Sequence, residues 1–496
     1  MTSKPRLLGL AGAGLFIAAL DAYVVVTLLP AMTGDVGLTI DRFEQATPIV
    51  TGFLAGYVVA MPLLGAYSDV RGRAPVYAAC MAAFAAGSII TATAGLWSFA
   101  GMPWLVIGRL VQGLGGGGLV PLSLALAADL YQDRARTVAL GSVAALQEAG
   151  SVLGPLYGAT LAAAATGAGG WRFVFLLNIP LAVICGVGLL WTSRGAAAGE
   201  PRTQSSVDWI SAGLLGVGLG LLVIAFYPDD PEHRATNALF FPAAIAGLLV
   251  LGGYIWRQLR QLEPLIPREL LRSRAFVGAT VANLLIGAAL MVALVDVPLL
   301  GRLVFNLDQL HSGLLLTQFL IGIPVGALLG GFATARFGAS VIATAGIALS
   351  AVAFVQMSQW DAHALTHRAD VSLAVCGLGF GVVIAPLTSS VLALTRSQSH
   401  GLATSLVVLA RTMGMLLGLS ALTAFGVYRF HQILGSPVLY ETDLRARIKH
   451  LAELVAAAFL QEYREIFTIA AALCFVAALV IILTTGGQRL RATAIK

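Results

Sequence analysis

The feature that most limits what this 496-residue sequence can form is a series of about fourteen apolar runs, each long enough to cross a bilayer as a helix. Hydrophobic residues make up 58% of the chain and charged residues only 11%, a balance that excludes an ordinary soluble protein. We therefore expect an all-α polytopic membrane protein. The runs lie near residues 7–31, 46–67, 76–96, 104–127, 138–165, 173–192, 209–227, 238–256, 276–300, 313–335, 340–360, 371–395, 402–428 and 466–485.

Basic residues fall in alternate loops, whereas the opposite loops are poor in arginine and hold acids such as Asp35, Asp41 and Asp229. The positive-inside rule then places both termini in the cytoplasm and predicts a multi-pass protein of the inner membrane. The net charge of +6 is explained by this topology, so it gives no support to nucleic-acid binding. The basic residues concerned are Lys4, Arg6, Arg71, Arg73, Arg134, Arg136, Arg194, Arg202, Arg257, Arg260, Arg268, Arg272 and Arg274.

The spacing of the runs predicts three parts. Residues 1–192 form an N-terminal six-helix bundle, and residues 276–496 form a C-terminal one. Residues 193–275 join them through a Gly- and Ala-rich linker and two extra transmembrane helices.

A long segment at about 428–465 interrupts the C-terminal bundle on the outer side, with a Gly-Ser-Pro turn signal near its middle. Its second half carries apolar residues at helical spacing, which gives the helix one apolar stripe. We expect a hairpin that stands above the membrane, and the alternative is an amphipathic helix lying flat on it. The apolar stripe consists of Leu444, Ile448, Leu451, Val455 and Phe459.

The run at 138–165 combines glycine, proline and one acid. Gly150, Gly154 and Gly158 are four apart, so they share a helix face and let a neighbouring backbone approach closely. Pro155 removes a backbone donor and weakens the helix locally. Glu148 is a carboxylate that is costly to bury in lipid and therefore marks a functional position.

These residues resemble a known signature. Together with Gly141 and Pro155, the three glycines match the antiporter motif of the major facilitator superfamily, with Ala159 in place of its last glycine. This motif belongs to the fifth membrane helix of drug/proton antiporters. The six-plus-two-plus-six layout resembles the fourteen-helix branch of that family, which implies two six-helix bundles of the major facilitator fold.

The loop near residue 70 resembles the cytoplasmic gating motif of the same superfamily. Gly65, Asp69, Gly72 and Arg73 match it, while Val70 takes the place of a basic residue. A carboxylate here can contact a helix N-terminus and an arginine in one conformation and lose both in another. The alternative interpretation is an ordinary positively charged turn.

Five charged residues lie within apolar runs, and four of them are the main candidates for proton coupling; the fifth, Asp296, is a weaker candidate near the outer end of its run. Asp21 is about 21 Å from the start of its run, and Arg109, on a run of opposite direction, lies at a comparable depth. Glu148 and Arg411 likewise lie at similar depths, one in each half of the chain. Each pair is either a titratable bridge or a static ion pair that only fixes helix packing.

Several classes of site are missing from the sequence. Three lysines in the whole chain leave no Gly-rich P-loop, and the histidines fall outside the apolar runs. The fragment from Gly113 to Gly118 fits a dinucleotide fingerprint, but no strand precedes it, so helix packing explains it better. We expect no catalytic residues, no metal site and no cofactor.

The motifs together predict a secondary transporter driven by the proton gradient. Away from these charged residues the helices offer mainly aliphatic, Gly and Ala side chains, which suits a very apolar solute. The segment from Ala19 to Thr27 and the outer extension resemble the mycobacterial branch of the family. That resemblance implies a monomeric exporter of triacylglyceride that delivers its membrane lipid to a periplasmic lipid-carrying lipoprotein. The alternatives are a multidrug/proton antiporter of amphiphilic drugs and a membrane-embedded lipid-modifying enzyme.

Overall fold

The fold is described by a computed structural model. It covers residues 3–37, 46–97, 101–164, 170–194, 209–226, 239–261, 272–361, 367–393, 400–435 and 444–485.

Within these ranges the regular secondary structure is helical, as the apolar runs predicted. One helix, α11, has 6 residues and every other has at least 18. Eleven of the helices are long and apolar enough to cross a membrane, so the number fourteen stays a prediction. The helices are α1 (Ser3–Asp35), α2 (Thr47–Arg71), α3 (Arg73–Ala92), α4 (Met102–Leu130), α5 (Asp133–Ala164), α6 (Gly170–Arg194), α7 (Trp209–Phe226), α8 (Phe240–Arg260), α10 (Arg274–Leu303), α11 (Gln309–Leu314), α12 (Thr317–Phe337), α13 (Ala339–Met357), α14 (His367–Ala393), α15 (His400–Leu434) and α16 (Leu444–Thr485).

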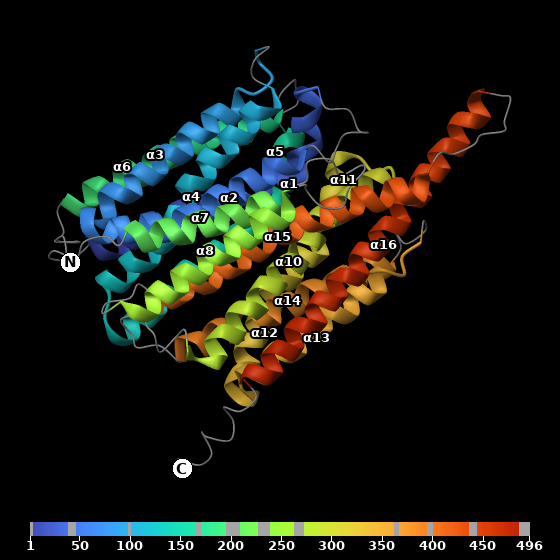
Figure 1. The fold of residues 1–496 in the computed structure, drawn as a ribbon. Helices are drawn as coiled ribbons and strands as arrows, with labels where there is room; N and C mark the ends of the chain where they lie inside the picture. The colour runs from blue at the N-terminus through green and yellow to red at the C-terminus, as the bar shows by residue number, and fades with distance from the viewer. Residues whose placement is uncertain are drawn as a thin grey trace.

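The helices pack in two groups. Helix α1 packs on α5, α2 on α4, and α3 on α6, whereas α10 packs on α15 and α16, and α12 on α14 (Figure 1). Helices α7 and α8 pack on each other, and α7 contacts both α2 and α15. The extra pair therefore lies against both groups. Several helix pairs bring residues from the two halves of the sequence together, above all α2 and α4 with α15, and α5 with α11 and α12.

Large apolar side chains cover the outside of the helices. Leu249 on α8 is 70% exposed, Phe332 on α12 is 79% exposed and Leu483 on α16 is 81% exposed. Such a surface is stable only against lipid, because a soluble protein rarely exposes continuous apolar patches of this size. The chain is therefore a multi-pass membrane protein.

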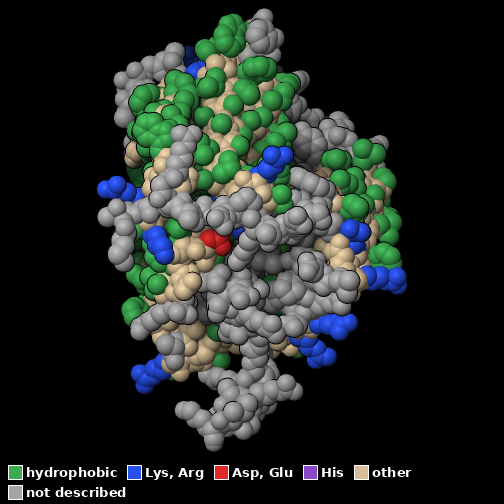
Figure 2. Space-filling model, turned by 90° about the vertical axis from the view of Figure 1, so that its left-hand side faces the viewer, with side chains coloured by type: hydrophobic (Ala, Val, Ile, Leu, Met, Phe, Trp, Pro, Cys, Tyr) green, Lys and Arg blue, Asp and Glu red, His purple; other side chains and the backbone are tan. Residues whose placement is uncertain are grey.

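One end of the helices carries mainly basic side chains among its described charged residues (Figure 2). The start of α1 and the end of α16 lie at the opposite end of the molecule from the projecting start of α16 (Figure 1). Figure 2 looks at the side on which α1 begins, and Lys and Arg side chains recur across it while acidic ones are scarce among the described residues.

Helix α16 runs from the outer extension into the last apolar run without a break, as an upright hairpin requires. The final apolar run and the polar helix before it form a single helix of 42 residues, about 63 Å long at about 1.5 Å per residue. Its first turns project beyond the other helices (Figure 1). Helix α15, with 35 residues, also continues past its apolar run. The turn expected between the two arms lies outside the described residues.

Candidate functional site: two ion pairs and an outer cavity

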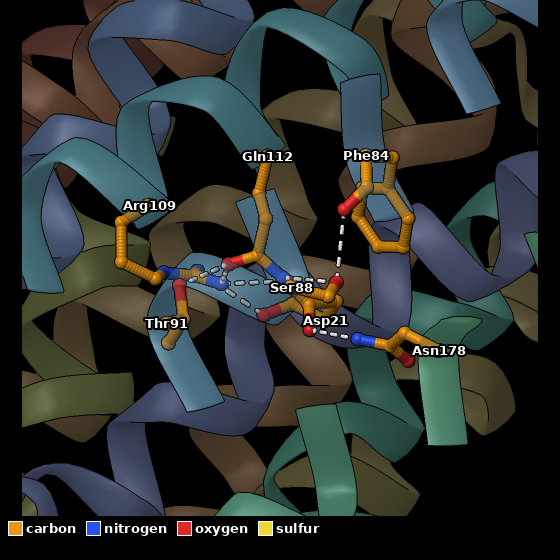
Figure 3. Close-up of polar contacts among 7 residues, drawn as sticks. All are labelled: Asp21, Phe84, Ser88, Thr91, Arg109, Gln112 and Asn178. Atoms are coloured by element: carbon orange, nitrogen blue, oxygen red, sulfur yellow. Dashed lines mark hydrogen bonds and ion pairs between the residues drawn. The ribbon is translucent and has the colours of Figure 1, made fainter. Parts of the chain in front are cut away.

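Asp21 on α1 and Arg109 on α4 form a sealed ion pair. Their side chains are 1% and 0% exposed, and the distance from Arg109 Nη1 to Asp21 Oδ2 is 2.5 Å. Arg109 Nη2 also donates to the Asp21 backbone oxygen at 3.2 Å. The second carboxylate oxygen accepts from Asn178 Nδ2 on α6 at 2.6 Å. Three helices are thus joined through one carboxylate (Figure 3).

A chain of side-chain hydrogen bonds extends this pair to α3. Arg109 Nη1 donates to Gln112 Oε1 at 2.9 Å, and Gln112 Nε2 donates to Ser88 Oγ at 2.8 Å (Figure 3). Thr91 Oγ1 donates to the same Gln112 oxygen at 3.2 Å. The guanidinium also lies 4.3 Å from the centre of the Phe53 ring. Nearly every polar atom here has a partner, although Arg109 Nε has none.

The glycines that follow Arg109 on α4 allow this close packing. A Cβ atom at Gly113 would lie 2.1 Å from the backbone oxygen of Phe53, and one at Gly115 would lie 2.5 Å from that of Cys80. Side chains at these positions would push α2 and α3 away. The fingerprint-like spacing is therefore explained by helix packing.

Glu148 on α5 and Arg411 on α15 form the second pair, and this pair joins the two halves of the chain. Arg411 Nη2 donates to Glu148 Oε1. The Arg411 side chain is 9% exposed and that of Glu148 is 28% exposed, so this pair is less sealed than the first. Beside it, Tyr23 Oη on α1 donates to Met415 Sδ on α15 at 3.2 Å. Both contacts must change if the two halves move apart.

The glycines of the antiporter motif pack α5 onto α1. Cβ atoms at Gly150 and Gly154 would each lie 2.5 Å from a backbone oxygen of α1, whereas one at Gly141 would meet nothing within 4 Å. At Gly158 the contact would be a side chain of α1 at 2.7 Å. The Pro155 oxygen accepts from Thr27 Oγ1 at 3.0 Å, which ties the proline level to the same neighbour.

The gating motif is only partly described. Gly72 separates α2 from α3 with φ of 91°, a conformation that favours glycine. Arg73 donates to Ser68 Oγ at 2.5 Å and lies 3.3 Å from Asp129 at the end of α4. Gly65 packs near Pro121, which a Cβ would approach to 3.2 Å. The side chain of Asp69 lies outside the described residues.

An outer cavity of about 430 Å³ lies where the two halves meet the foot of the hairpin. Val455 and Phe459 of the predicted stripe line it, and the Phe459 ring stacks on Phe430 at 4.2 Å between centroids. Leu451 is 39% exposed above it, while the side chains of Leu444 and Ile448 are outside the described set. The other lining residues are Leu29, Val50, Val295, Asp296, Leu299, Leu303, Leu419, Thr423, Val427, His431, Leu434, Glu462, Tyr463 and Ile466.

Sequence reasoning missed three contributors to these sites. Asn178, Asp129 and Glu462 were not among the predicted site residues. Glu462 follows Phe459 by three positions and Val455 by seven, so helical spacing places it on the stripe face. That spacing is the signal that would have found it. In the described part of the chain, no group of three or more His, Cys, Asp or Glu is arranged to hold a metal ion.

Comparison with known proteins decides the family. A model described as Major Facilitator Superfamily matches residues 11–419. The chain belongs to this superfamily. A Mycolicibacterium smegmatis protein named as a triacylglyceride transporter is 39% identical over 95% of this chain and 85% of its own. One from Mycobacterium tuberculosis with the same description is 37% identical over 95% and 92%.

Solved structures agree on the major facilitator fold. A bacterial homologue of the human lysosomal transporter Spinster, crystallised inward-facing and occupied, superposes with a TM-score of 0.68 at 14% identity, covering 98% of this chain and 97% of that one. A peptide transporter of the POT family gives 0.65 at 17% identity, covering 97% of each chain. The protein is a membrane transporter and not an enzyme.

Proposed function

We propose that this major facilitator exports a highly apolar lipid, of the triacylglyceride class, from the inner membrane in exchange for protons. The observation that carries the proposal is the pair of intramembrane carboxylate–arginine bridges, one sealed in the N-terminal half and one across the two halves. Intramembrane charges are costly and usually functional. The proton gradient is the energy source and no cofactor takes part.

Protonation of a bridge provides the coupling step. When Asp21 or Glu148 takes up a proton, its arginine loses the ionic partner and the bridge weakens. Because the bridge from Glu148 to Arg411 joins α5 to α15, its protonation state biases the position of one half relative to the other. Gly72 and Arg73 act at the gating loop, where Asp129 is the partner.

Three observations support a lipid as substrate. Relatives with close to 40% identity are named as triacylglyceride transporters. The outer cavity is lined mainly by apolar side chains, which suits acyl chains. The start of α16 extends away from the other helices, and a lipid leaving the membrane needs such shielding because each exposed methylene costs about 0.8 kcal/mol.

The remaining features of the proposal follow from topology. Both termini are cytoplasmic by the positive-inside rule, so the hairpin faces the periplasm. There it guides the lipid to a periplasmic lipid-carrying lipoprotein. We expect the transporter to work as a monomer.

Transport in proteoliposomes tests the proposal. Under an imposed pH gradient, the purified protein is expected to move labelled triacylglyceride, while a cationic dye serves as the probe for drug export. Asp21→Asn and Glu148→Gln should fold but lose gradient-driven export. Asp308→Asn is the control, because Asp308 is 64% exposed and caps α11, a role that Asn also fills. Wild-type rates in both variants, or movement of the dye alone, would sink the proposal.

The hairpin needs a separate experiment. Removing about two helical turns from each arm preserves the face that each arm presents and should leave insertion intact. We expect this shortened protein to lose lipid export, whereas Leu451→Asn, which keeps the length, should retain most of it. Equal export by the shortened and intact proteins would show that the hairpin has no part in lipid transfer.

A further inference from the structure

Two carboxyl groups line the outer cavity without a cationic partner. Asp296 comes from α10 and Glu462 from α16. Among the described residues neither forms an ion pair or a hydrogen bond. Glu462 is only 7% exposed, and its Oε2 atom is buried without a hydrogen-bond partner. This situation differs from that of Asp21 and Glu148, which are both paired with arginine.

The position of Glu462 depends on close contact with α15. Its Oε1 atom lies where a Cβ at Gly426 would come within 2.4 Å, so the carboxyl group packs directly against the α15 backbone at that glycine. The nearby arginines are engaged elsewhere. Arg429 forms two bonds to Glu465, at 2.7 and 3.0 Å, and Arg464 Nε donates to the Trp360 backbone oxygen at 2.6 Å. The two acids therefore share the cavity without a counter-charge.

The other groups around the cavity do not supply one. His431 Nδ1 lies 2.9 Å from the Val427 backbone oxygen, and α1 and α2 contribute only apolar side chains. The titratable or charged groups around the two acids are His431 and Arg429 from α15, and Tyr463 and Glu465 from α16. Glu462 is buried and Asp296 is partly buried, and a carboxyl group shielded from water without a counter-charge takes up a proton rather than remain ionised. In that state it carries one O–H donor.

The chemistry of a triester fits such donors. Triacylglyceride has ester oxygens as its only polar atoms, and these accept hydrogen bonds but cannot donate them. A site for its glycerol region must therefore supply donors, while the acyl chains need apolar walls. Phe430, Phe459 and Val455 provide such walls beside the two acids.

We propose that Asp296 and Glu462, as neutral acids, donate hydrogen bonds to the ester carbonyl groups of the lipid and form an exit subsite below the hairpin. This inference rests on the proposed lipid export but assigns a role separate from proton coupling. An acidic outer side, from which protons enter during the exchange, keeps the acids neutral and the subsite able to bind. In alkaline buffer the acids lose their protons, and the resulting carboxylates can only accept hydrogen bonds, so they hold the ester less tightly.

Equilibrium binding to the full-length protein in nanodiscs tests the subsite. The probes are trioctanoylglycerol and its trioctyl ether analogue, which lacks the carbonyl groups. Two neutral hydrogen bonds correspond to about tenfold in affinity, so the wild type should bind the ester about tenfold more tightly in mildly acidic than in mildly alkaline buffer. The ether should show no such difference.

Substitutions distinguish the loss of the hydrogen-bond donors from damage to the fold. Asp296→Asn with Glu462→Gln places permanent N–H donors in the cavity, so ester binding should become independent of pH. Asp296→Leu with Glu462→Leu should bind the ester about tenfold more weakly at both pH values. Glu465→Gln is the matched control, because Glu465 is one helical turn away on α16 and is bonded to Arg429. Ester binding by this variant should depend on pH as it does in the wild type.

The outcomes distinguish this inference from the proposed function. If ester binding by the Asp296→Asn/Glu462→Gln variant depends on pH as in the wild type, the assignment of the two acids as donors is wrong while lipid export stands. The same holds if binding of the ether depends on pH as binding of the ester does. If the wild type binds the ester equally at both pH values, the same conclusion follows. If it binds neither probe and exports no lipid, both proposals fail.

Discussion

The two carboxylate–arginine pairs differ in how completely the protein encloses them. The pair of Asp21 and Arg109 lies within one half, is almost fully buried, and is held by side chains of α1, α3, α4 and α6. The pair of Glu148 and Arg411 joins the two halves, and the Glu148 side chain is 28% exposed. Water can therefore replace a lost partner in the second pair but not in the first. The first pair is therefore the more costly one to leave without a partner, and the second is the easier one to break and remake.

The largest expected effect comes from removing each arginine in turn. Arg109→Met leaves the Asp21 carboxylate buried without its charge partner and should lower the free energy of unfolding by about 3–5 kcal/mol. Arg411→Met should cost no more than about 1 kcal/mol, because water solvates part of Glu148. Thermal unfolding midpoints of the purified proteins measure the difference. If the two variants lose equal amounts of stability, the two pairs do not differ in how far water can solvate the remaining carboxylate.

A substitution on the antiporter helix tests how firmly the two pairs are linked. Asp21 is on α1 and Glu148 on α5, and these helices meet at Gly154. Gly154→Ala brings a Cβ within 2.5 Å of the Leu20 backbone oxygen and should cost about 1–3 kcal/mol by overpacking. Gly141→Ala, on the same helix but in open space, should be neutral or stabilise by up to about 1 kcal/mol. A neutral Gly154→Ala would show that α1 and α5 are free to separate.

The smallest effect is the coupling energy of the pair that joins the halves. A double-mutant cycle with Glu148→Gln and Arg411→Gln should give a coupling energy of about 0.5–1 kcal/mol, because the pair is partly exposed. The control cycle combines Glu148→Gln with Arg429→Gln, whose arginine is bonded to Glu465 instead, and should be additive within about 0.5 kcal/mol. Additivity in the first cycle would mean that the two residues do not stabilise each other.

The depth of a residue in the membrane was readable from the sequence, whereas the neighbours of a helix were not. Counting about 1.5 Å per residue placed Asp21 level with Arg109 and Glu148 level with Arg411, and the structure brings each pair into contact. The bilayer makes this possible because every spanning helix starts from a common plane. The same regularity made the helical fold and the approximate helix bounds predictable.

Lateral contacts depend on how the helices are ordered around the bundle, and no period in the sequence records that order. Asn178 reaches Asp21 only because α6 packs beside α1, and Asp129 meets Arg73 only because α3 packs beside α4. The outer cavity was missed for the same reason, since five helices contribute to it. The continuity of α16, by contrast, was expected from the sequence, because no turn signal separates its first half from the final apolar run.

That continuity has a mechanical consequence. A helix with no break from its projecting start to its far end behaves as a lever whose pivot is the packing of α16 against α10 and α13. The pair of bonds from Arg429 to Glu465 braces the second arm against the first near that pivot. A small tilt of the C-terminal helices therefore moves the tip of α16 by a larger distance. A molecule bound at the tip would be displaced in each transport cycle.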